Sequence, residues 1–282
     1  MDAAALASWV GREERSFDEV AATPVAAYAA LRDREPVRPD AGTPIPLLAH
    51  WFYCRPLYRQ STLGADGHVE RGDFLPPIAL PRRMWAGSRF GFRAPVRVGD
   101  RLERRSTVLA VTPKQGRTGP LVFVRVGHRL VANDVLAIEE EHDIVYRDMP
   151  APGEAPATAV AAPQGAQWRD EVRPDPVMLF RYSALTFNGH RIHYDRPYTM
   201  ATEGYPGLVV HGPLMGTLLV DALAVRHGQA RITRYAFKAA RPVFDVAPFH
   251  VCGRVDGPRA NLWIEDAEGR LCMEATADLA AA

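Results

Sequence analysis

The stretch that decides the fold is residues 213–226, PLMGTLLVDALAVR. It is apolar around nearly its whole circumference, and it begins with a proline, which the first turn of a helix accepts because that turn needs no backbone N–H donor. Gly212 comes directly before it. A helix that is apolar on all sides has to be buried on all sides. The sequence therefore predicts one helix enclosed by the rest of its domain.

Extended, β-rich segments follow this helix, and a matching set lies in the first half of the chain. Turn residues separate them at 114–120 and Asn133-Asp134 in the first half, and at 256–258 and Glu268-Gly269 in the second. Both halves are predicted to end as antiparallel meanders. The expected strands cover residues 104–112, 121–130, 136–146, 249–255, 260–265 and 271–277.

The two halves also resemble each other at one constant offset. Residues 90–98, FGFRAPVRV, align with residues 237–245, FKAARPVFD, pairing Phe with Phe and Pro-Val with Pro-Val. Such a repeat indicates two copies of one structural unit. One buried helix wrapped by a strongly curved antiparallel sheet is the hot-dog arrangement, and two such units side by side would merge their sheets. We therefore expect an α+β double hot-dog fold with a central helix in each unit.

A second helical pattern and a linker complete the predicted organisation. Residues 16–34 are predicted to be helical with Ser16 as the N-cap and Glu19 three residues later, although Pro24 would divide the helix into two pieces. Residues 149–167, MPAPGEAPATAVAAPQGAQ, contain almost no large apolar side chain and are predicted to be a linker. The linker would separate an N-terminal domain, residues 1–148, from a C-terminal domain, residues 168–282.

The composition excludes several classes of partner. The 34 Lys and Arg against 33 Asp and Glu leave a net charge of +1, so no overall field draws the chain to nucleic acid or to an anionic membrane. No apolar run has the length of a signal peptide or of a membrane span. The three cysteines, Cys54, Cys252 and Cys272, are too few and too far apart for a disulfide framework or a cysteine zinc site. We expect a cytoplasmic protein.

Residues 180–198, FRYSALTFNGHRIHYDRPY, are dense in polar and ionisable groups. This segment resembles the motif of type-2 enoyl-CoA hydratases and MaoC-like dehydratases, in which a small hydroxyl residue and an aspartate precede Asn-Pro-aliphatic-His and a second aspartate follows. Residues 210–214, VHGPL, extend the resemblance. The corresponding positions here are Thr186, Asn188, His190, Ile192, His193 and Asp195.

The first half is similar to one branch of that family, the fused hydroxyacyl-thioester dehydratases of type 2, which include mesaconyl-CoA hydratases. The matching residues are 63–68 LGADGH, 74–77 FLPP, 80–87 LPRRMWAG and 144–147 IVYR. The resemblance implies reversible hydration of a 2-enoyl-CoA thioester, with a branched dicarboxylic substrate such as mesaconyl-CoA, no cofactor and a homodimer as one possible assembly. It also implies that the first half is not catalytic and shapes the acyl pocket.

Hydration requires a base for the attacking water, an acid for the α-carbon and a donor for the enolate-like thioester oxygen. His193 suits the proton transfers, and Gly212 can offer a backbone N–H at the start of the buried helix. The wider family has an aspartate where this chain has Asn188, whose amide orients water but takes no proton. Either His193 handles both transfers while Asn188 holds the water, which we favour, or Asp195 supplies a second carboxylate.

The phosphates of CoA call for basic residues near the site. The candidates for contact with CoA or substrate are Arg82, Arg83, Arg191, Lys238, Arg241 and His211, although His211 would more simply be a packed or solvent-facing side chain.

Three other interpretations stay open from the sequence. His190, His193 and Asp195 have the residue types of a zinc or ferrous iron site, although no separate cluster completes such a set. A hot-dog thioesterase would use the same fold to activate water against the thioester carbonyl. Asn188 would also suit a catalytically silent acyl-CoA-binding protein.

Overall fold

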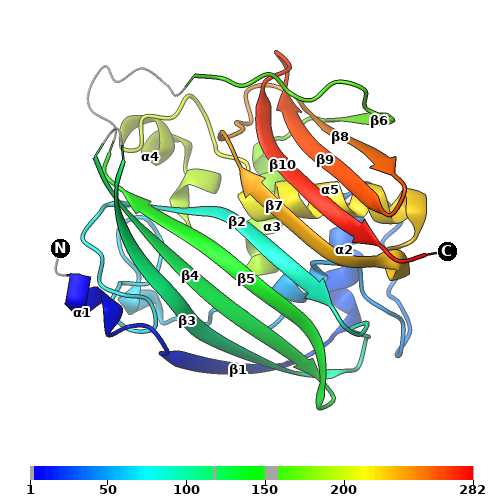
Figure 1. Cartoon of the computed structure of the whole chain (residues 1–282), viewed down its shortest axis with the longest axis horizontal. Coiled ribbons are helices and arrows are strands. Elements are labelled where there is room, and N and C mark those ends of the chain that lie inside the picture. The colour runs from blue at the N-terminus through cyan, green and yellow to red at the C-terminus, as the bar shows by residue number, and fades with distance from the viewer. Residues whose placement is uncertain (1–2, 117–118, 150–157, 282) are drawn as a thin grey trace.

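One antiparallel sheet of ten strands dominates the residues that the computed structural model describes, 3–116, 119–149 and 158–281 (Figure 1). The strand order is β1-β3-β4-β5-β2-β7-β10-β9-β8-β6. The last five strands repeat the first five in reverse, so two five-stranded units join at β2 and β7. The bounds are β1 Glu13–Glu19, β2 Arg82–Phe92, β3 Arg101–Gly116, β4 Gly119–Ala132, β5 Val135–Arg147, β6 Trp168–Val172, β7 Ile232–Ala239, β8 Phe249–Asp256, β9 Arg259–Asp266 and β10 Leu271–Leu279.

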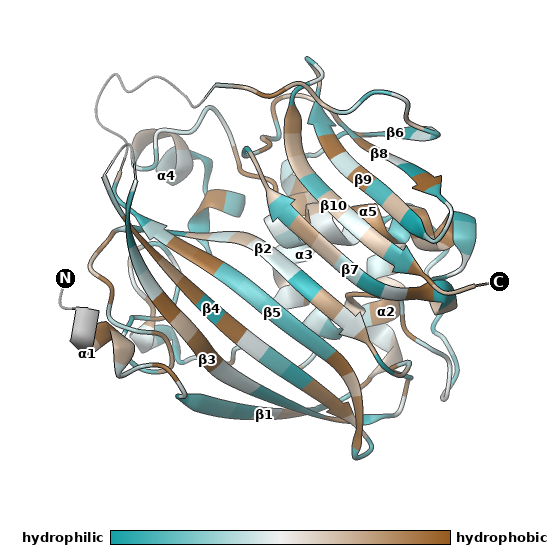
Figure 2. Ribbon diagram, viewed as in Figure 1, coloured by the Kyte–Doolittle hydropathy of each residue, from teal (hydrophilic) through white to brown (hydrophobic). Residues whose placement is uncertain are grey.

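The predicted meanders are confirmed, and all six expected strands are present. Asn133 and Asp134 both have positive φ, 45° and 67°, as the two central residues of a tight hairpin turn between β4 and β5. Hydrophobic and hydrophilic residues alternate along β3, β4 and β5 (Figure 2), as expected for a sheet with one face inside and one face in water. The predicted turn at 114–120 differs, because β3 continues to Gly116; residues 117–118 lie outside the described residues.

The repeated segments lie where the two units meet. Ser88 pairs with Phe237 across the β2–β7 junction, and the rings of Phe90 and Phe237 lie 6.2 Å apart. The Pro-Val pairs have equivalent roles. The carbonyl of Val96 accepts from the Ile45 N–H at 2.9 Å, and the carbonyl of Val243 accepts from the Val210 N–H at 2.8 Å.

The central helix α5, Gly212–His227, is buried as predicted, and its ten residues 214–223 are all inaccessible. It lies against β7, β8, β9 and β10 (Figure 1). Its one carboxylate in this stretch, Asp221, accepts from Arg34 at 2.7 and 3.0 Å and from Arg32 at 3.3 Å. The remaining helices are α1 Ala3–Ala7, α2 Ala22–Leu31, α3 Pro176–Thr186 and α4 Arg196–Ala201, with 3-10 turns η1 Ala49–Phe52, η2 Gln60–Thr62, η3 Arg191–His193 and η4 Gln229–Arg231.

The first unit differs from the second in what covers its sheet. Beyond Ile45, the counterpart of Val210, the chain forms only the short turn η1 where the second unit begins α5. The sheet of the first unit also carries a buried carboxylate, Glu140. Phe90 pairs with Glu140, whereas its counterpart Phe237 pairs with Ala275.

The prediction of a helix over residues 16–34 is wrong in its first part. Ser16 is no helix cap, because Glu13–Glu19 forms the edge strand β1 paired with β3. The helix α2 begins only at Ala22, and Pro24 lies in its first turn, where no N–H donor is lost. Tertiary pairing with β3 therefore overrides the local capping pattern.

The predicted linker, residues 149–167, is partly outside the described residues, which omit 150–157. Its later part is packed rather than free, since Ala162 is 5% exposed against Cys252 and Trp263 and its N–H donates to Gly269 at 2.9 Å. The domain boundaries stay a prediction. All three cysteines are buried free thiols. None of the described helices has the length and apolarity needed to cross a membrane.

Candidate active site

The histidine-rich segment is a short loop held at both ends by helices. α3 ends at Thr186, and Phe187, which caps it, has a left-handed φ of 53°. The N–H of Asn188 donates to the Ser183 carbonyl at 2.8 Å. At the other end the Asp195 carboxylate accepts from the Tyr198 N–H at 3.1 Å and caps α4. The segment between them therefore has a defined conformation against the core.

His193 is a buried, neutral imidazole. The residue is 7% exposed, and its Nδ1 lies 2.7 Å from the Val209 carbonyl oxygen. A carbonyl can only accept, so Nδ1 carries the hydrogen and Nε2 keeps its lone pair. Burial lowers the pKa of His193 to about 4. At neutral pH His193 is therefore an acceptor suited to the role of a general base.

His193 lies close to Gly212, because it stacks on His211, the residue that directly precedes Gly212. The rings of His193 and His211 stack with centroids 3.7 Å apart, and the His211 Nε2 lies 2.8 Å from the Ser183 hydroxyl. His211 is fully buried, so it is packed and not solvent-facing. Gly212 follows as the first residue of α5, where helix N–H groups lack partners within the helix and carry partial positive charge.

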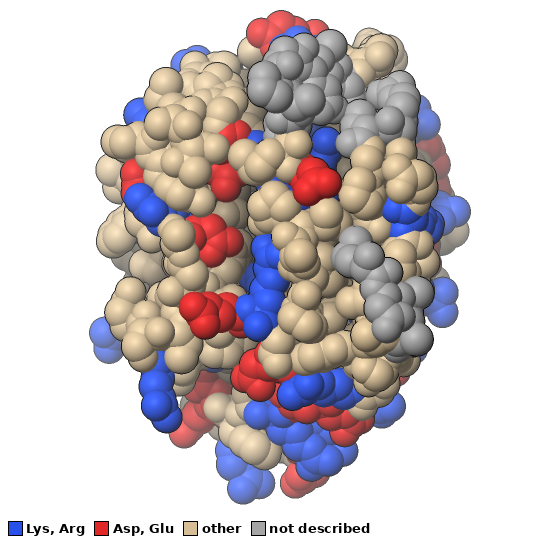
Figure 3. All heavy atoms as spheres, turned by 90° about the vertical axis from the view of Figure 1, so that its left-hand side faces the viewer, with Lys and Arg blue, Asp and Glu red and all other residues tan. Residues whose placement is uncertain are grey.

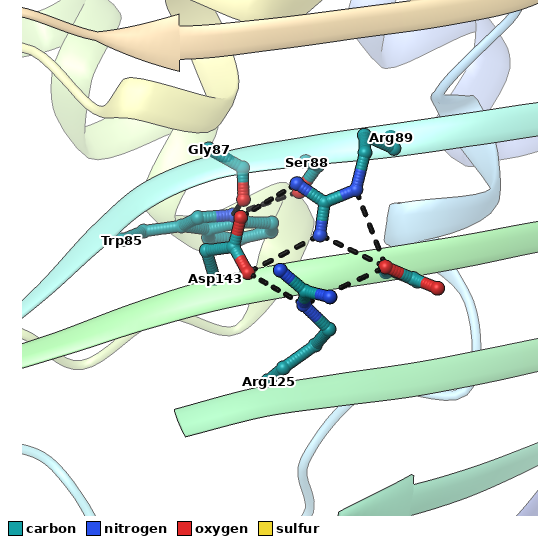
Figure 4. A network of polar contacts seen from close by, with 7 residues as sticks. Trp85, Gly87, Ser88, Arg89, Arg125 and Asp143 are labelled. Atoms are coloured by element: carbon teal, nitrogen blue, oxygen red, sulfur yellow. Dashed lines mark hydrogen bonds and ion pairs between the residues drawn. The ribbon is translucent and has the colours of Figure 1, made fainter. Parts of the chain in front are cut away.

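Trp85, on β2 of the first unit, borders the same helix end. A Cβ placed on Gly212 would lie 3.9 Å from the Trp85 carbonyl oxygen, an ordinary contact. A register shift in β2 between Trp85 and Gly87 turns the Trp85 indole N–H toward the Ser88 hydroxyl and the Gly87 carbonyl, at 2.9 and 3.1 Å (Figure 4). On the outer face of the same strands, Arg89 and Arg125 both donate hydrogen bonds to the Asp143 carboxylate (Figure 4). These bonds stabilise the sheet beside the bulge.

Asn188 and Asp195 have local roles. The side-chain carbonyl of Asn188 accepts from the His190 N–H at 3.0 Å, which leaves its NH₂ group to donate. One Asp195 oxygen caps α4, and the other accepts from Arg191 at 2.7 and 2.9 Å. Hydrogen bonds from the Tyr198 N–H and Arg191 lower the pKa of Asp195. Both Asp195 oxygens are thus engaged, which favours the alternative in which His193 handles both proton transfers.

Arg191 also has a structural position. Besides Asp195, its guanidinium donates to the Ala65 carbonyl at 2.9 Å and lies over the Tyr198 ring at 4.0 Å. These contacts tie the loop to a segment of the first half. Arg191 is not among the residues that line the cavity beside the loop.

Sequence reasoning missed two side chains of the first half that lie in this site. Asp66 and His68 form a pair, with Nδ1 of His68 3.0 Å from the Asp66 carboxylate. The His68 ring lies 4.0 Å from that of His190, which in turn lies 5.4 Å from His193. The matched run LGADGH contained both residues, and its Asp-x-His spacing was the available signal.

Asp66, His68 and His190 have the residue types and closeness of a metal site, with ligand atoms all within 4.8 Å of one another. Their arrangement is nevertheless that of a hydrogen-bonded pair beside a third ring. Both Asp66 oxygens already accept from His68, one from its backbone N–H and one from Nδ1, each at 3.0 Å. In the described part of the chain, the set considered from sequence, with His193 and Asp195, does not form such a cluster.

A cavity of about 650 Å³ opens beside this cluster. Arg71 and Arg83 supply its basic groups, and Figure 3 shows a recess with basic side chains on the face that carries α4. Arg71 was not a predicted candidate; it donates to the carbonyls of Ile78, Leu80 and Pro81 and so organises its own loop. The cavity is lined by Gly64, Ala65, Asp66, His68, Val69, Glu70, Arg71, Pro81, Arg83, Met149, Tyr198, Thr202 and Glu203.

The other predicted basic residues lie elsewhere. Arg82 pairs with Glu203 at 3.3 Å, so only its neighbour Arg83 lines the cavity. Lys238 is exposed beside Glu274, because it alternates with Phe237, which faces the core. Arg241 follows the end of β7, where its N–H donates to the Cys272 carbonyl at 3.1 Å. Neither Lys238 nor Arg241 is among the residues that line the cavity.

Comparisons with known proteins show the family to which the chain is related. Residues 48–245 match the family model of hydroxyacyl-thioester dehydratase type 2. The chain is 45% identical to mesaconyl-C(4)-CoA hydratase of Chloroflexus aurantiacus over 99% of both chains. It is 26% identical to the mitochondrial hydroxyacyl-thioester dehydratase type 2 of Schizosaccharomyces pombe, over 77% of this chain and 79% of that protein.

Solved structures confirm the predicted fold. A MaoC-like dehydratase from Phytophthora capsici superposes over the full length of both chains with a TM-score of 0.71 and 13% identity. A Mycobacterium tuberculosis protein described as a double hot-dog fold matches over 96% of both chains with a TM-score of 0.58 and 14% identity. At these identities the likeness concerns the fold alone.

Proposed function

The chain belongs to the hydroxyacyl-thioester dehydratase type 2 family, and we propose that it reversibly adds water across the double bond of a 2-enoyl-CoA thioester. The observation that carries this proposal is the buried His193, whose Nδ1 donates to the Val209 carbonyl and whose Nε2 is left to accept a proton. That acceptor lies next to the N-terminal end of α5, because His211, on which it stacks, directly precedes Gly212.

The proton transfers balance on His193 alone. The oxygen of water bonds to the β-carbon while Nε2 of His193 takes one of its protons. The π electrons move toward the thioester oxygen, where the Gly212 N–H stabilises the developing negative charge. The imidazolium then returns the same proton to the α-carbon. Dehydration is the reverse sequence, and the NH₂ group of Asn188 is available to orient the water.

The acyl group is proposed to be a branched dicarboxylic one, as in mesaconyl-CoA. The support is the 45% identity to a protein named mesaconyl-C(4)-CoA hydratase over nearly the whole chain. The CoA phosphates are assigned to the cavity that Arg83 and Arg71 line, since guanidinium groups pair well with phosphate oxygens.

The test is loss of the enoyl-thioester absorbance when the purified protein meets mesaconyl-CoA or crotonyl-CoA. We expect turnover of the dicarboxylic ester to be faster, and His193→Ala to lower the rate by ~100-fold or more. His227→Ala, at the opposite end of α5, serves as the matched control. Release of free CoA thiol in place of hydration would identify a thioesterase and refute the proposal.

A further inference from the structure

Two ionisable side chains of the first half, Asp66 and His68, reach the histidine cluster of the second half. We propose that they are a positioning pair for His193: Asp66 fixes His68, and the pair orients the cluster and offsets the charge that His193 gains during proton transfer. This inference rests on the proposed function and extends it, because it makes the first half part of the proton-transfer machinery.

The two segments are docked backbone to backbone. Gly67 has a φ of +87°, and a Cβ there would lie 1.9 Å from the Gly189 carbonyl oxygen, so no other residue fits. The Arg191 N–H donates to the Asp66 carbonyl at 2.9 Å. The segment that carries His68 is therefore placed against the segment that carries His190 and His193 without intervening side chains.

The contacts then run through two rings to His193. Both oxygens of Asp66 accept from His68, which fixes the ring and places the hydrogen on Nδ1. The His68 ring lies 4.0 Å from that of His190 at an interplanar angle of 42°. The His190 ring meets the His193 ring edge to face, at 5.4 Å and 88°. Displacing His68 would therefore disturb the packing that holds His193.

The charges around the cluster give Asp66 a second role. Burial lowers the pKa of His68 and His193 to about 4 and also lowers those of His190 and His211, so the four rings are neutral at neutral pH. From the first half, Arg71 and Arg83 add positive charge.

The negative charge on the other side is that of Asp66. Burial opposes its ionisation, but the hydrogen bonds from His68 keep its pKa below the usual range. When His193 takes the proton of water, the cluster gains one positive charge in a buried place. The Asp66 carboxylate offsets that charge, which the uncharged amide of Asn188 cannot do.

The experiment compares Asp66→Asn and His68→Gln with the wild-type chain. We expect kcat to fall by ~10-fold or more in each, with KM within about twofold, because the reacting groups are disturbed and the CoA site is not. The acid limb of the pH profile should move to lower pH in Asp66→Asn, which loses the counter-charge. It should move to higher pH in His68→Gln, which removes a ring whose own protonation opposes that of His193.

A rescue variant separates this role from simple support of the fold. Asn188→Asp places a carboxylate next to His190. The side chain of residue 188 already accepts a hydrogen bond from the His190 backbone N–H. It should recover most of the kcat lost in Asp66→Asn. Glu171→Gln, which breaks the 3.9 Å contact with His250 on the distant β6–β8 edge, is the matched control and should change neither kcat nor the pH profile.

Three outcomes would overturn the inference. If His193→Ala abolishes hydration while Asp66→Asn and His68→Gln keep wild-type rates and pH limbs, the pair has no such role and the proposed function stands. A metal site would be shown by three results together: Zn²⁺ or Fe²⁺ binds the wild type, neither variant binds it, and a chelator abolishes activity. If no enoyl-CoA is hydrated, the proposed function fails. The pair can still be tested in that case, because an NMR titration of His193 that is the same in Asp66→Asn as in the wild type would refute it.

Discussion

His193 and His211 stack with ring centroids 3.7 Å apart and an interplanar angle of 18°. Both rings are buried; burial lowers the pKa of each, and the His193 ring lowers the pKa of His211 further. Two stacked imidazoles at this distance cannot both be protonated without strong repulsion. Burial of the stacked pair therefore keeps His193 in the neutral form that a general base requires.

This contact predicts the pH dependence of activity. Because the pKa of His193 is lowered to about 4, its free base persists well below the ordinary histidine range. The acid limb of kcat/KM for hydration should have an apparent pKa near that value instead of ~6.5. His211→Phe keeps an aromatic ring and the burial of His193, and His211 is itself neutral in this range, so the limb should stay in place. A limb that stays at ~6.5 in the wild type would contradict the assignment of His193.

The same rings predict the pH dependence of stability. Their pKa values are lower in the folded than in the unfolded chain, so the unfolded chain binds more protons between the two values. Stability should therefore be complete above pH ~6.5 and fall as the pH decreases toward 4, by up to about 1.4 kcal/mol per pH unit for each histidine. Urea unfolding from pH 7.5 to 4.5 measures this slope. His193→Ala should make it shallower.

Gly67→Ala should separate the two docked segments. The new methyl group would lie 1.9 Å from the Gly189 carbonyl, and the residue would keep a φ that alanine disfavours. We expect loss of most hydratase activity with a smaller loss of stability, because the contact lies between surface segments and not in the core. Gly99→Ala provides the comparison, since Gly99 also has positive φ but open space around it. Equal activity losses in the two variants would show that φ, and not docking, matters.

Asp221→Ala should loosen the central helix. It leaves Arg34 and Arg32 without the carboxylate that they share on the buried face of α5. We expect a loss of about 2 kcal/mol in the free energy of unfolding, the range of hydrogen bonds to charged groups. Asp170→Ala, which breaks the partly exposed pair with Arg226, should cost under about 1 kcal/mol. Chemical denaturation compares the two variants.

Glu140→Ala should destabilise the first unit more strongly. Glu140 is 6% exposed and accepts from the rings of His50 and Trp51 at 3.0 Å, with His142 also in contact. Burial raises the pKa of Glu140, but the electrostatic effect of His142 and the hydrogen bonds from His142 and His50 keep it well below the usual range. Removing one partner of a buried charged network costs about 3–5 kcal/mol. A loss below 1 kcal/mol in urea unfolding would refute the buried ion network.

Arg83→Ala should weaken CoA binding. Arg83 lines the cavity next to His68, so its loss should raise KM for acyl-CoA esters with little change in kcat. Lys238→Ala, on the outer face of β7, should leave KM within about twofold of the wild type. Steady-state kinetics with one enoyl-CoA measure both variants. The opposite ranking would place the phosphate site on the outer face of β7 and not at the cavity.

Local patterns in the sequence determined much of the fold. The all-apolar run at 213–226 predicted α5, because only burial accommodates such a helix. Alternation and turn residues predicted the strands, and the Phe and Pro-Val repeats predicted two merging units. The motif from Asn188 to Asp195 located the histidine loop. Each of these features depends on residues close together in the chain.

Only the tertiary structure decided which of those residues meet. Ser16 lies in a strand because β3 pairs with it, and Asp195 is engaged because Arg191 folds back onto it. Asp66 and His68 reach His190 across more than a hundred positions of sequence, because Gly67 allows two backbones to touch. Residue types alone report what a side chain is able to do, whereas its partners depend on long-range packing that no local pattern contains.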